Sequence, residues 1–348
     1  MNKYYAAIAR SVLEKISLEP LRNKEILITG SNGLLGSHFV AAIALANKTQ
    51  GLNAKVTGVS RGPLPLWLVE IFTEKKFQFI QKDLGKEKLP SFENSHFDFV
   101  IHAATYAQPK KFLQQPLETM RLNSTISMSL LELCARSKAS FLFLSSSEVY
   151  GNPPQEMRPT LESYPGNASS LDPRAPYATS KRFTETLCKV YNDAGMARCC
   201  IARVAPTYGP GVSVSDDRVW NELIRRALTA DSFRLLDNGQ QQRRWLYISD
   251  AIIMLFHALL YSRELVYNVG GTDFRSIHEL ATYVSKNTKT TLQLPESDAM
   301  SSHALGAPAI VDVNSEKIRK EVGLSSLVNL EDGISSCVNW TRSLLEIA

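Results

Sequence analysis

The chain has 348 residues, a formal net charge of +5 and a hydrophobic share of 44%. This length predicts one or two domains with a substantial core. Lys and Arg occur in runs no longer than two, whereas nucleic-acid binders typically carry a basic stripe with interleaved aromatic residues. We therefore expect no nucleic-acid partner, and a small anionic substrate is enough to explain the mildly basic balance.

The cysteines and the apolar segments bear on compartment and membrane contact. Five cysteines occur without a CxxC pair, which predicts neither a disulfide framework nor a zinc site, and we expect no metal. They are typical of reduced thiols in a cytoplasmic protein. Lys3 is not followed by a signal-peptide core, and the apolar stretch at 251–260 is far below the roughly 18 residues of a membrane span. We expect no membrane partner.

Hydrophobic periodicity divides the chain into alternating strands and helices. The first 17 residues place apolar side chains at helical spacing, and such a helix could pack on its own domain or on a partner subunit. Expected strands follow at 25–30, 54–60, 77–84, 97–104, 140–151 and 197–211, and expected helices at 36–47, 117–137 and 177–194. The looser C-terminal part predicts helices near 217–230, 248–262, 276–286 and 330–346.

Apolar strands separated by helices indicate a parallel sheet covered on both faces. The predicted fold is α/β: a Rossmann-type doubly wound parallel sheet with a smaller, mixed α/β C-terminal lobe. We expect an N-terminal helix over 1–20, a dinucleotide-binding domain over 21–205 with a return segment at about 240–262, and a substrate-binding lobe over 206–239 and 263–348.

The sequence TGSNGLLG carries three glycines between an expected strand and an expected helix. In a dinucleotide-binding loop Gly30 would allow the tight turn, Gly33 would admit the pyrophosphate, and Gly36 would let helix and strand pack closely. The helix N-terminus would offer amides and a positive dipole to the phosphates. A plain tight turn is the alternative.

Two further positions bear on which dinucleotide binds. A ribose-binding acid would favour NAD at the end of the second strand, but Ser60 and Arg61 stand there. Arg61 could pair with a 2′-phosphate or be a solvated loop residue, so NAD and NADP both stay open, with NAD slightly favoured. Asp83 and Leu84 could clamp the adenine, and an ordinary exposed Asp83 is the alternative.

Tyr177 and Lys181 share one helical face because they are four residues apart. The strand before them ends in SSSEVYG, which delivers hydroxyls to the carboxyl edge of the sheet, where such sheets bind ligands. A glycine loop, a hydroxyl cluster and YxxxK thus occur in order. With DFVIHAAT, RVAPTYGPG and YNVGG, they make residues 24–290 resemble the extended short-chain dehydrogenase/reductase family.

The resemblance implies an NAD(P)-dependent enzyme that modifies a nucleoside-diphosphate sugar as an epimerase, a decarboxylase or a dehydratase. Such enzymes oxidise the sugar at C4 to a transient 4-keto intermediate and then return the hydride. Tyr177 would be the base, with Lys181 favouring its phenolate and Ser146 bonding the same sugar oxygen. The resemblance places the cofactor against Gly30, Asn32, Gly33, Leu34, Leu35, Gly36, Ser60, Arg61, Asp83, Leu84, Ala103, Ala104, Thr105, Ser145, Tyr177 and Lys181.

The family's 4,6-dehydratases have an Asp–Glu pair where this chain has Ser147 and Glu148, and Ser147 is no comparable acid. The sequence looks more similar to UDP-glucuronate decarboxylases, in which Glu148 would be catalytic. The resemblance implies substrate contacts from Ser147, Glu148, Arg218, Val219, Arg243 and Tyr247. Pro206 replaces a common Asn, however, so the substrate could differ, and decarboxylation, epimerisation and dehydration all stay open.

Three other expectations complete the sequence-based interpretation. A keto-sugar reductase using NADPH and a non-catalytic dinucleotide sensor are the alternatives to a cofactor-recycling enzyme. The family commonly forms homodimers through a four-helix bundle, to which each subunit would contribute the helices at 117–137 and 177–194. A cytoplasmic homodimer is therefore expected.

Overall fold

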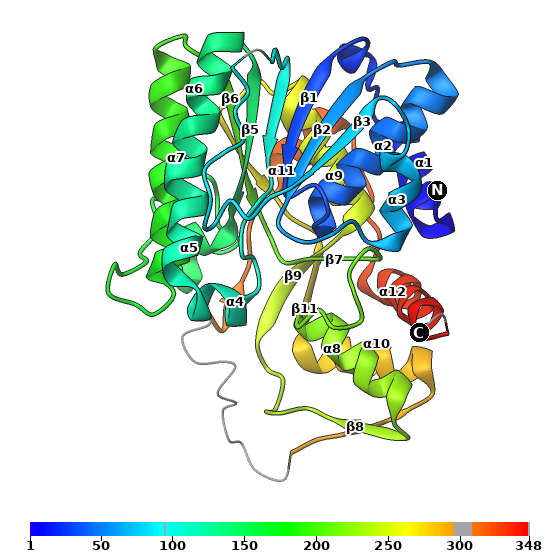
Figure 1. The fold of residues 1–348 in the computed structure, drawn as a ribbon. Coiled ribbons are helices and arrows are strands. Elements are labelled where there is room, and N and C mark those ends of the chain that lie inside the picture. Colours follow the sequence, from blue (N-terminus) through cyan, green and yellow to red (C-terminus); the bar gives the residue numbers. More distant parts are fainter. Residues whose placement is uncertain (94, 296–307, 347–348) are drawn as a thin grey trace.

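A seven-stranded parallel sheet organises the larger part of the molecule (Figure 1). The computed structural model describes residues 1–93, 95–295 and 308–346. The strand order is β10-β6-β5-β4-β1-β2-β3, which is the doubly wound arrangement predicted from the sequence. The strands of this sheet are β1 (Glu25–Thr29), β2 (Lys55–Ser60), β3 (Phe77–Gln81), β4 (Phe99–His102), β5 (Ser140–Ser146), β6 (Arg198–Val204) and β10 (Val266–Val269).

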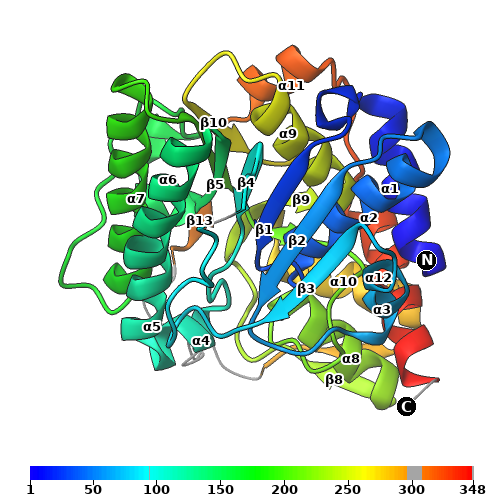
Figure 2. The same cartoon turned by 45° about the horizontal axis from the view of Figure 1, so that its top comes forward.

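Helices cover both faces of the sheet, so its central strands are buried on both sides, as their continuous apolar runs predict (Figure 2). One face carries α1 (Lys3–Lys15), α2 (Leu34–Gln50), α9 (Ile248–Leu260) and α11 (Glu316–Val322). The other carries α5 (Pro116–Arg121), α6 (Ser127–Ser137) and α7 (Ala175–Asp193). A π-helical segment, Leu122–Ile126, joins α5 to α6, so the helix expected at 117–137 is nearly continuous.

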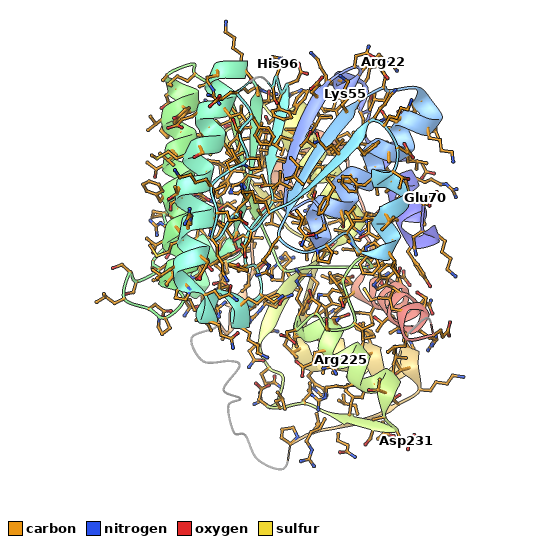
Figure 3. The ribbon with its side chains drawn as sticks, in the orientation of Figure 1. Arg22, Lys55, Glu70, His96, Arg225 and Asp231 are labelled. Carbon is orange, nitrogen blue, oxygen red and sulfur yellow. The ribbon has the colours of Figure 1, made fainter. Side chains whose placement is uncertain are left out.

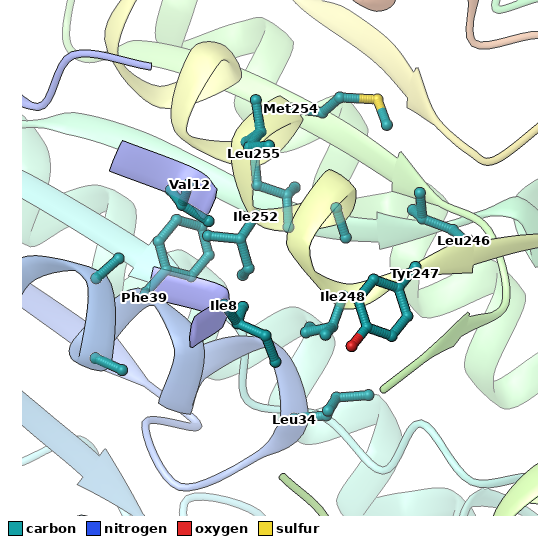
Figure 4. Close-up of a cluster of buried hydrophobic side chains, with 14 of the residues drawn as sticks. Ile8, Val12, Leu34, Phe39, Leu246, Tyr247, Ile248, Ile252, Met254 and Leu255 are labelled. Carbon is teal, nitrogen blue, oxygen red and sulfur yellow. The ribbon is translucent and has the colours of Figure 1, made fainter. Parts of the chain in front are cut away.

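The first helix packs on its own domain. Helix α1 contacts α2 and α9, and its side chains Ile8 and Val12 lie beside Phe39 and Ile252 in the buried cluster of Figure 4. The hydroxyl of Tyr5 is 2.8 Å from that of Ser37 in the first turn of α2. This settles the choice that the sequence left open, because the apolar face of α1 is already covered.

A smaller lobe lies beyond the carboxyl edge of the sheet (Figure 1). Its mixed sheet has the order β11-β9-β13, with β7 also paired to β9, and a two-stranded sheet pairs β8 with β12. These strands are β7 (Thr207–Tyr208), β8 (Ser232–Arg234), β9 (Gln242–Tyr247), β11 (Asp273–Ser276), β12 (Thr291–Gln293) and β13 (Ile310–Val311). Its helices are α8 (Val219–Thr229), α10 (Ile277–Thr288) and α12 (Leu330–Leu345), whereas α3 (Leu66–Phe72) and α4 (Pro109–Gln114) flank the main sheet's carboxyl edge.

The boundary between the two parts differs from the expected one at two strands. Strand β10 was assigned to the lobe, but it pairs in parallel with β6 in the main sheet. Strand β9 was assigned to the return segment, but it forms the centre of the lobe sheet. The strand with which such a short strand pairs decides which sheet it joins. Neither apolar run is long enough for the sequence alone to show that sheet.

Charged side chains lie on the surface and the cysteines lie in the core. The charged side chains labelled in Figure 3, among them Lys55, Glu70 and Arg225, lie on different sides of the molecule. All five cysteines are free and buried. Among the described residues, no helix has the length and apolarity to cross a membrane, and no group of His, Cys, Asp or Glu side chains could hold a metal ion.

Candidate active site

The glycine loop between β1 and α2 has the geometry of a dinucleotide cradle. Gly30 has a φ of +73°, and its N–H donates to the carbonyl of Val59 over 2.7 Å. A Cβ on Gly36 would lie 2.1 Å from the carbonyl oxygen of Gly30, so only glycine fits there. Gly33 caps the N-terminus of α2, where Leu34 and Leu35 form the first turn. These positions fit a bound pyrophosphate.

Two of the predicted cofactor residues hold the loop itself. The N–H of Asn32 donates to the buried hydroxyl of Ser60 over 3.1 Å. The side-chain amide of Asn32 donates to the carbonyl oxygens of Gly62 and Pro63 over 3.0 and 3.1 Å. Because these groups are already bonded, Asn32 and Ser60 fix the loop's shape.

The remaining cofactor candidates line the neighbouring strand ends. Arg61 is exposed, and its guanidinium lies 4.7 Å from the ring centre of Tyr106. Asp83 accepts from the N–H of Gly85 over 3.0 Å. After β4 come Ala103, Ala104 and Thr105, whose buried hydroxyl has no partner among the described residues. Leu84 is buried in the adjoining core. An unpartnered hydroxyl at the strand end suits a polar ligand.

Tyr177 and Lys181 lie together on the first turns of α7, against the end of β5. Lys181 donates to the carbonyl of Leu144 over 2.7 Å, and its ammonium is 5.9 Å from the ring centre of Tyr177. Burial lowers the pKa of Lys181 to about 7, against the opposing charge of Glu185. Ser146 also hydrogen-bonds Tyr177, so Ser146, Tyr177 and Lys181 lie together at the carboxyl end of β5.

The electrostatics of Tyr177 in the protein alone oppose its ionisation. Burial and the negative charge of Glu148 raise the pKa of Tyr177, while a hydrogen bond with Ser146 and the charges of Arg174 and Arg218 lower it. A phenol that acts as a base near neutral pH needs a lowered pKa, and a positive charge nearby, such as an oxidised nicotinamide, would favour this. On balance the protein's own groups do not lower the pKa of Tyr177, because desolvation of the buried ring is the largest effect and raises it.

Glu148 is held by Arg174, a residue that the sequence analysis missed. The Nε of Arg174 donates to one carboxylate oxygen of Glu148 over 3.1 Å, and an Nη donates to the other. The guanidinium also lies 4.9 Å from the ring centre of Phe112, which stacks on Tyr177. An arginine in a Pro-rich loop has no local signal for this role, because its partners are distant in the sequence.

Of the other substrate candidates, Arg243 and Ser147 lie near Glu148, whereas Arg218 and Val219 lie at the start of α8. The Nη1 of Arg243 donates to the carbonyls of Gln242 and Ala309 over 2.8 and 3.0 Å. Burial lowers the pKa of Arg243 to about 10, with Glu148 acting in the opposite direction. Arg218 pairs with Asp216 at 3.5 Å. Next to Arg218, Val219 begins α8 and is 39% exposed. Ser147 and Glu148 line a small cavity shared with Asp312.

Two of the expected contact residues, Tyr247 and Ser145, have their hydroxyls engaged within the protein. The hydroxyl of Tyr247 donates to that of Ser336 in α12 over 3.0 Å, and its ring is part of the buried cluster of Figure 4. The hydroxyl of Ser145 donates to Glu185 over 2.6 Å within a buried network. Strand alternation explains Ser145: its side chain points to the opposite face from that of Ser146.

A larger cavity of about 490 Å³ lies between α1 and α2, with Arg10, Leu45 and Lys48 in its lining. None of the predicted site residues lines it. Chemistry, not size, therefore locates the candidate active site at the carboxyl edge of the sheet.

Comparison with known proteins agrees with this geometry. The model of the NAD dependent epimerase/dehydratase family matches residues 26–270. UDP-glucuronic acid decarboxylase 1 of Xenopus tropicalis is 27% identical over 93% of this chain and 73% of its own. UDP-glucuronic acid decarboxylase 6 of Arabidopsis thaliana is 29% identical over 90% of both chains.

Solved structures show the same architecture. UDP-glucuronic acid 4-epimerase of Bacillus cereus, solved with UDP-glucuronic acid and NAD, superposes with a TM-score of 0.73 at 25% identity, over 92% of this chain and 99% of that one. The NDP-hexosamine 5,6-dehydratase TunA, of tunicamycin biosynthesis, superposes with a TM-score of 0.74 at 23% identity, covering 92% and 98%. The second likeness bears on the fold alone.

Proposed function

Because this chain belongs to the NAD dependent epimerase/dehydratase family, we propose that it converts a nucleoside-diphosphate sugar through a transient 4-keto intermediate. The sugar would be oxidised at C4, changed at a neighbouring carbon and reduced again. NAD, when bound, would take up and return the two electrons of this cycle. The observation that carries the proposal is the meeting of Tyr177, Lys181 and Ser146 at the same carboxyl edge of the sheet as the glycine loop.

Each residue of this cluster has a distinct part in the oxidation. The phenol of Tyr177 would take the proton of the C4 hydroxyl, and Ser146 would hydrogen-bond the same oxygen. Lys181, fixed by the carbonyl of Leu144, would place a positive charge near the phenolate. The glycine loop, Arg61, Asp83, Leu84 and the strand end at 103–105 would hold the cofactor.

Glu148 would act after the oxidation. A 4-keto sugar has an acidic C5 proton and, in a uronate, an unstable carboxylate, so one intermediate leads to epimerisation or decarboxylation. Ser147 cannot protonate a leaving hydroxyl as an Asp would, and this argues against dehydration. The names of the decarboxylase relatives and of the epimerase structure support the two favoured outcomes equally.

The substrate diphosphate would lie against the arginines of the smaller lobe. The guanidinium of Arg243 is largely buried beside Glu148 and Arg174, and Arg218 stands at the start of α8. Arginine suits phosphate because its planar donors bind two oxygens at once. Val219 and Ser147 would line the same cleft.

The protein would be a cytoplasmic homodimer, and its exposed apolar residues and its cysteines support this. Exposed apolar side chains on α6 and α7, among them Met128, Phe183 and Val190, support a homodimer formed through these helices. Five free, buried cysteines suit a reducing compartment, which supports the cytoplasm.

The test is to incubate the purified protein with UDP-, GDP-, CDP- and dTDP-sugars, uronates included, without added cofactor. Loss of carbon dioxide from the product mass would mean decarboxylation, and loss of water would mean dehydration. An unchanged mass with a new sugar spin system in NMR would mean epimerisation. Net consumption of added NADPH would favour a reductase. A protein that binds NAD but converts no sugar would favour the non-catalytic sensor.

A further inference from the structure

We infer that Arg174 is a positioning residue that holds the carboxylate of Glu148 for the step following C4 oxidation. This inference rests on the proposed function, because it gives Glu148 its part in the second stage. Arg174 contacts Glu148, Phe112 and the first turn of α7, and these contacts give it this part.

The contact between Arg174 and Glu148 has the strongest form that an ion pair takes in proteins. Both carboxylate oxygens accept from the guanidinium, which fixes the plane of the carboxylate as well as its position. The side chains are 9% and 21% exposed, so solvent screens the pair only weakly. Glu148 lies on a short 3-10 turn, Ser147–Tyr150, whose backbone alone would leave its side chain free to rotate.

Arg174 is itself fixed by the turn that carries Tyr177. Its backbone N–H donates to a carboxylate oxygen of Asp172 over 2.7 Å, and its carbonyl accepts from the N–H of Tyr177 over 3.1 Å. Arg174 therefore connects the residue expected to act on the C4 hydroxyl with the residue expected to act on the keto sugar.

A stacked row of side chains restrains the guanidinium from its other side. The ring of Phe112 lies between Arg174 and Tyr177, and the Phe112 and Tyr177 ring centres are 4.7 Å apart with an interplanar angle of 13°. Phe112 belongs to α4, which is tied to the smaller lobe because Gln108 donates to Asp216 over 2.6 Å. Movement of the guanidinium would disturb this row.

Two other arginines, Arg243 and Arg218, act on Glu148 or Tyr177, but their direct contacts are with other groups. Arg243 donates to two backbone carbonyls, and Arg218 pairs with Asp216. Their charges act on Glu148 or Tyr177 through space. Among the described residues, Arg174 alone forms an ion pair with Glu148.

The test is a double-mutant cycle with Arg174→Met and Glu148→Gln, supported by Arg174→Lys and by the control Arg182→Met in the same helix. With a substrate found for the wild type, two readouts are followed: appearance of reduced nicotinamide on mixing, for the oxidation, and formation of final product. Because the charge of Arg174 also lowers the pKa of Tyr177, Arg174→Met should slow the oxidation by less than about tenfold. It should slow product formation further, on the order of 100-fold, so that reduced cofactor accumulates.

The cycle separates positioning from a general structural role. In the Glu148→Gln background, Arg174→Met should slow product formation no further, because the carboxylate it positions is gone. Arg174→Lys should recover part of the rate, since it keeps the charge but loses the bidentate geometry. Arg182→Met should behave as the wild type. Equal loss of both stages, or an additive loss in the double variant, would overturn the inference.

A stability measurement needs no substrate and uses the four proteins of the cycle: the wild type, Arg174→Met, Glu148→Gln and the double variant. Arg174→Met should lower the melting temperature because it leaves a partly buried carboxylate unpaired, and adding Glu148→Gln should restore part of the loss. If the wild type converts no sugar in the panel, the proposed function and this role fall together, even where the stability coupling is present. If the wild type is active and Arg174→Met forms product at the wild-type rate, only the inference about Arg174 is overturned.

Discussion

The carboxylate of Glu185 in α7 and the guanidinium of Arg203 in β6 form a buried ion pair, with an Arg203 Nη2 to Glu185 Oε2 distance of 2.7 Å. The hydroxyl of Ser145 donates to the same carboxylate, and Arg203 donates to the hydroxyl of Tyr150. This network joins the helix that carries Tyr177 and Lys181 to the sheet. It therefore helps to fix α7, and with it Tyr177 and Lys181, against the sheet.

Breaking this pair should destabilise the fold strongly. Glu185→Gln leaves the arginine charge buried without its partner, which should lower the free energy of unfolding by about 3 kcal/mol. The urea midpoint measures this. The exposed pair of Lys189 and Asp193 on the same helix gives the control, because Asp193→Asn should change stability by about 0.5 kcal/mol or less. Equal midpoints for the two variants would contradict the role of the buried pair.

Removing the hydroxyl of Tyr177 should greatly slow turnover without weakening the binding of the cofactor. Tyr177→Phe should lower the conversion rate on the order of 10²- to 10⁴-fold, because the proton acceptor is gone while the ring still stacks on Phe112. The rate is followed by product mass, and NAD affinity by calorimetry. Tyr191→Phe on the same helix is the matched control. A Tyr177→Phe variant with wild-type turnover would exclude Tyr177 as the base.

A methyl group in the glycine loop should block the cofactor. In Gly36→Ala the new Cβ meets the backbone carbonyl of Gly30, so the loop must shift and the dissociation constant for NAD should rise about tenfold or more. Calorimetric titration measures it. Gly62→Ala is the control, since its Cβ would lie at an ordinary contact distance of 3.7 Å from the side-chain nitrogen of Asn32. Unchanged affinity in Gly36→Ala would argue against the cradle.

Stability should depend on pH through Asp250. Burial raises the pKa of Asp250 to about 6 in the folded protein, although an N–H from Val328 opposes the shift. The folded state then binds more protons than the unfolded state between about pH 4 and pH 6, so this group's contribution falls as pH rises through that window. Relative to Asp250→Asn, the wild type should lose on the order of 2–3 kcal/mol there. Denaturant titrations across the window measure this, and parallel pH profiles would contradict it.

The homodimer can be tested on the outer face of α7. Phe183 and Val190 are 47% and 55% exposed and seven residues apart, so they share one face of the helix. Replacing both by Glu should convert the dimer to a monomer in sedimentation analysis, because two charges would be buried at an apolar contact. Val69→Glu, an equally apolar but remote position on α3, should leave the dimer intact. A wild-type protein that sediments as a monomer would refute this assembly.

Local patterns of the sequence were enough for the fold and for part of the site. The parallel sheet was predicted because β1, β4 and β5 are short apolar runs separated by helical segments. The glycine loop and the Tyr177–Lys181 pair were predicted because their geometry depends on spacings of three or four residues. Family membership, which the comparisons confirm, was indicated by the same motifs.

The tertiary structure decided what depends on partners distant in the sequence. Arg174 meets Glu148 across 26 positions, and Phe112 reaches Tyr177 from another helix, so no local pattern could reveal either contact. The hydroxyl of Tyr247 bonds to Ser336 in α12, 89 positions away, which no local pattern could reveal either. Periodicity fixes which face of an element is apolar, whereas packing between elements decides what each polar side chain meets.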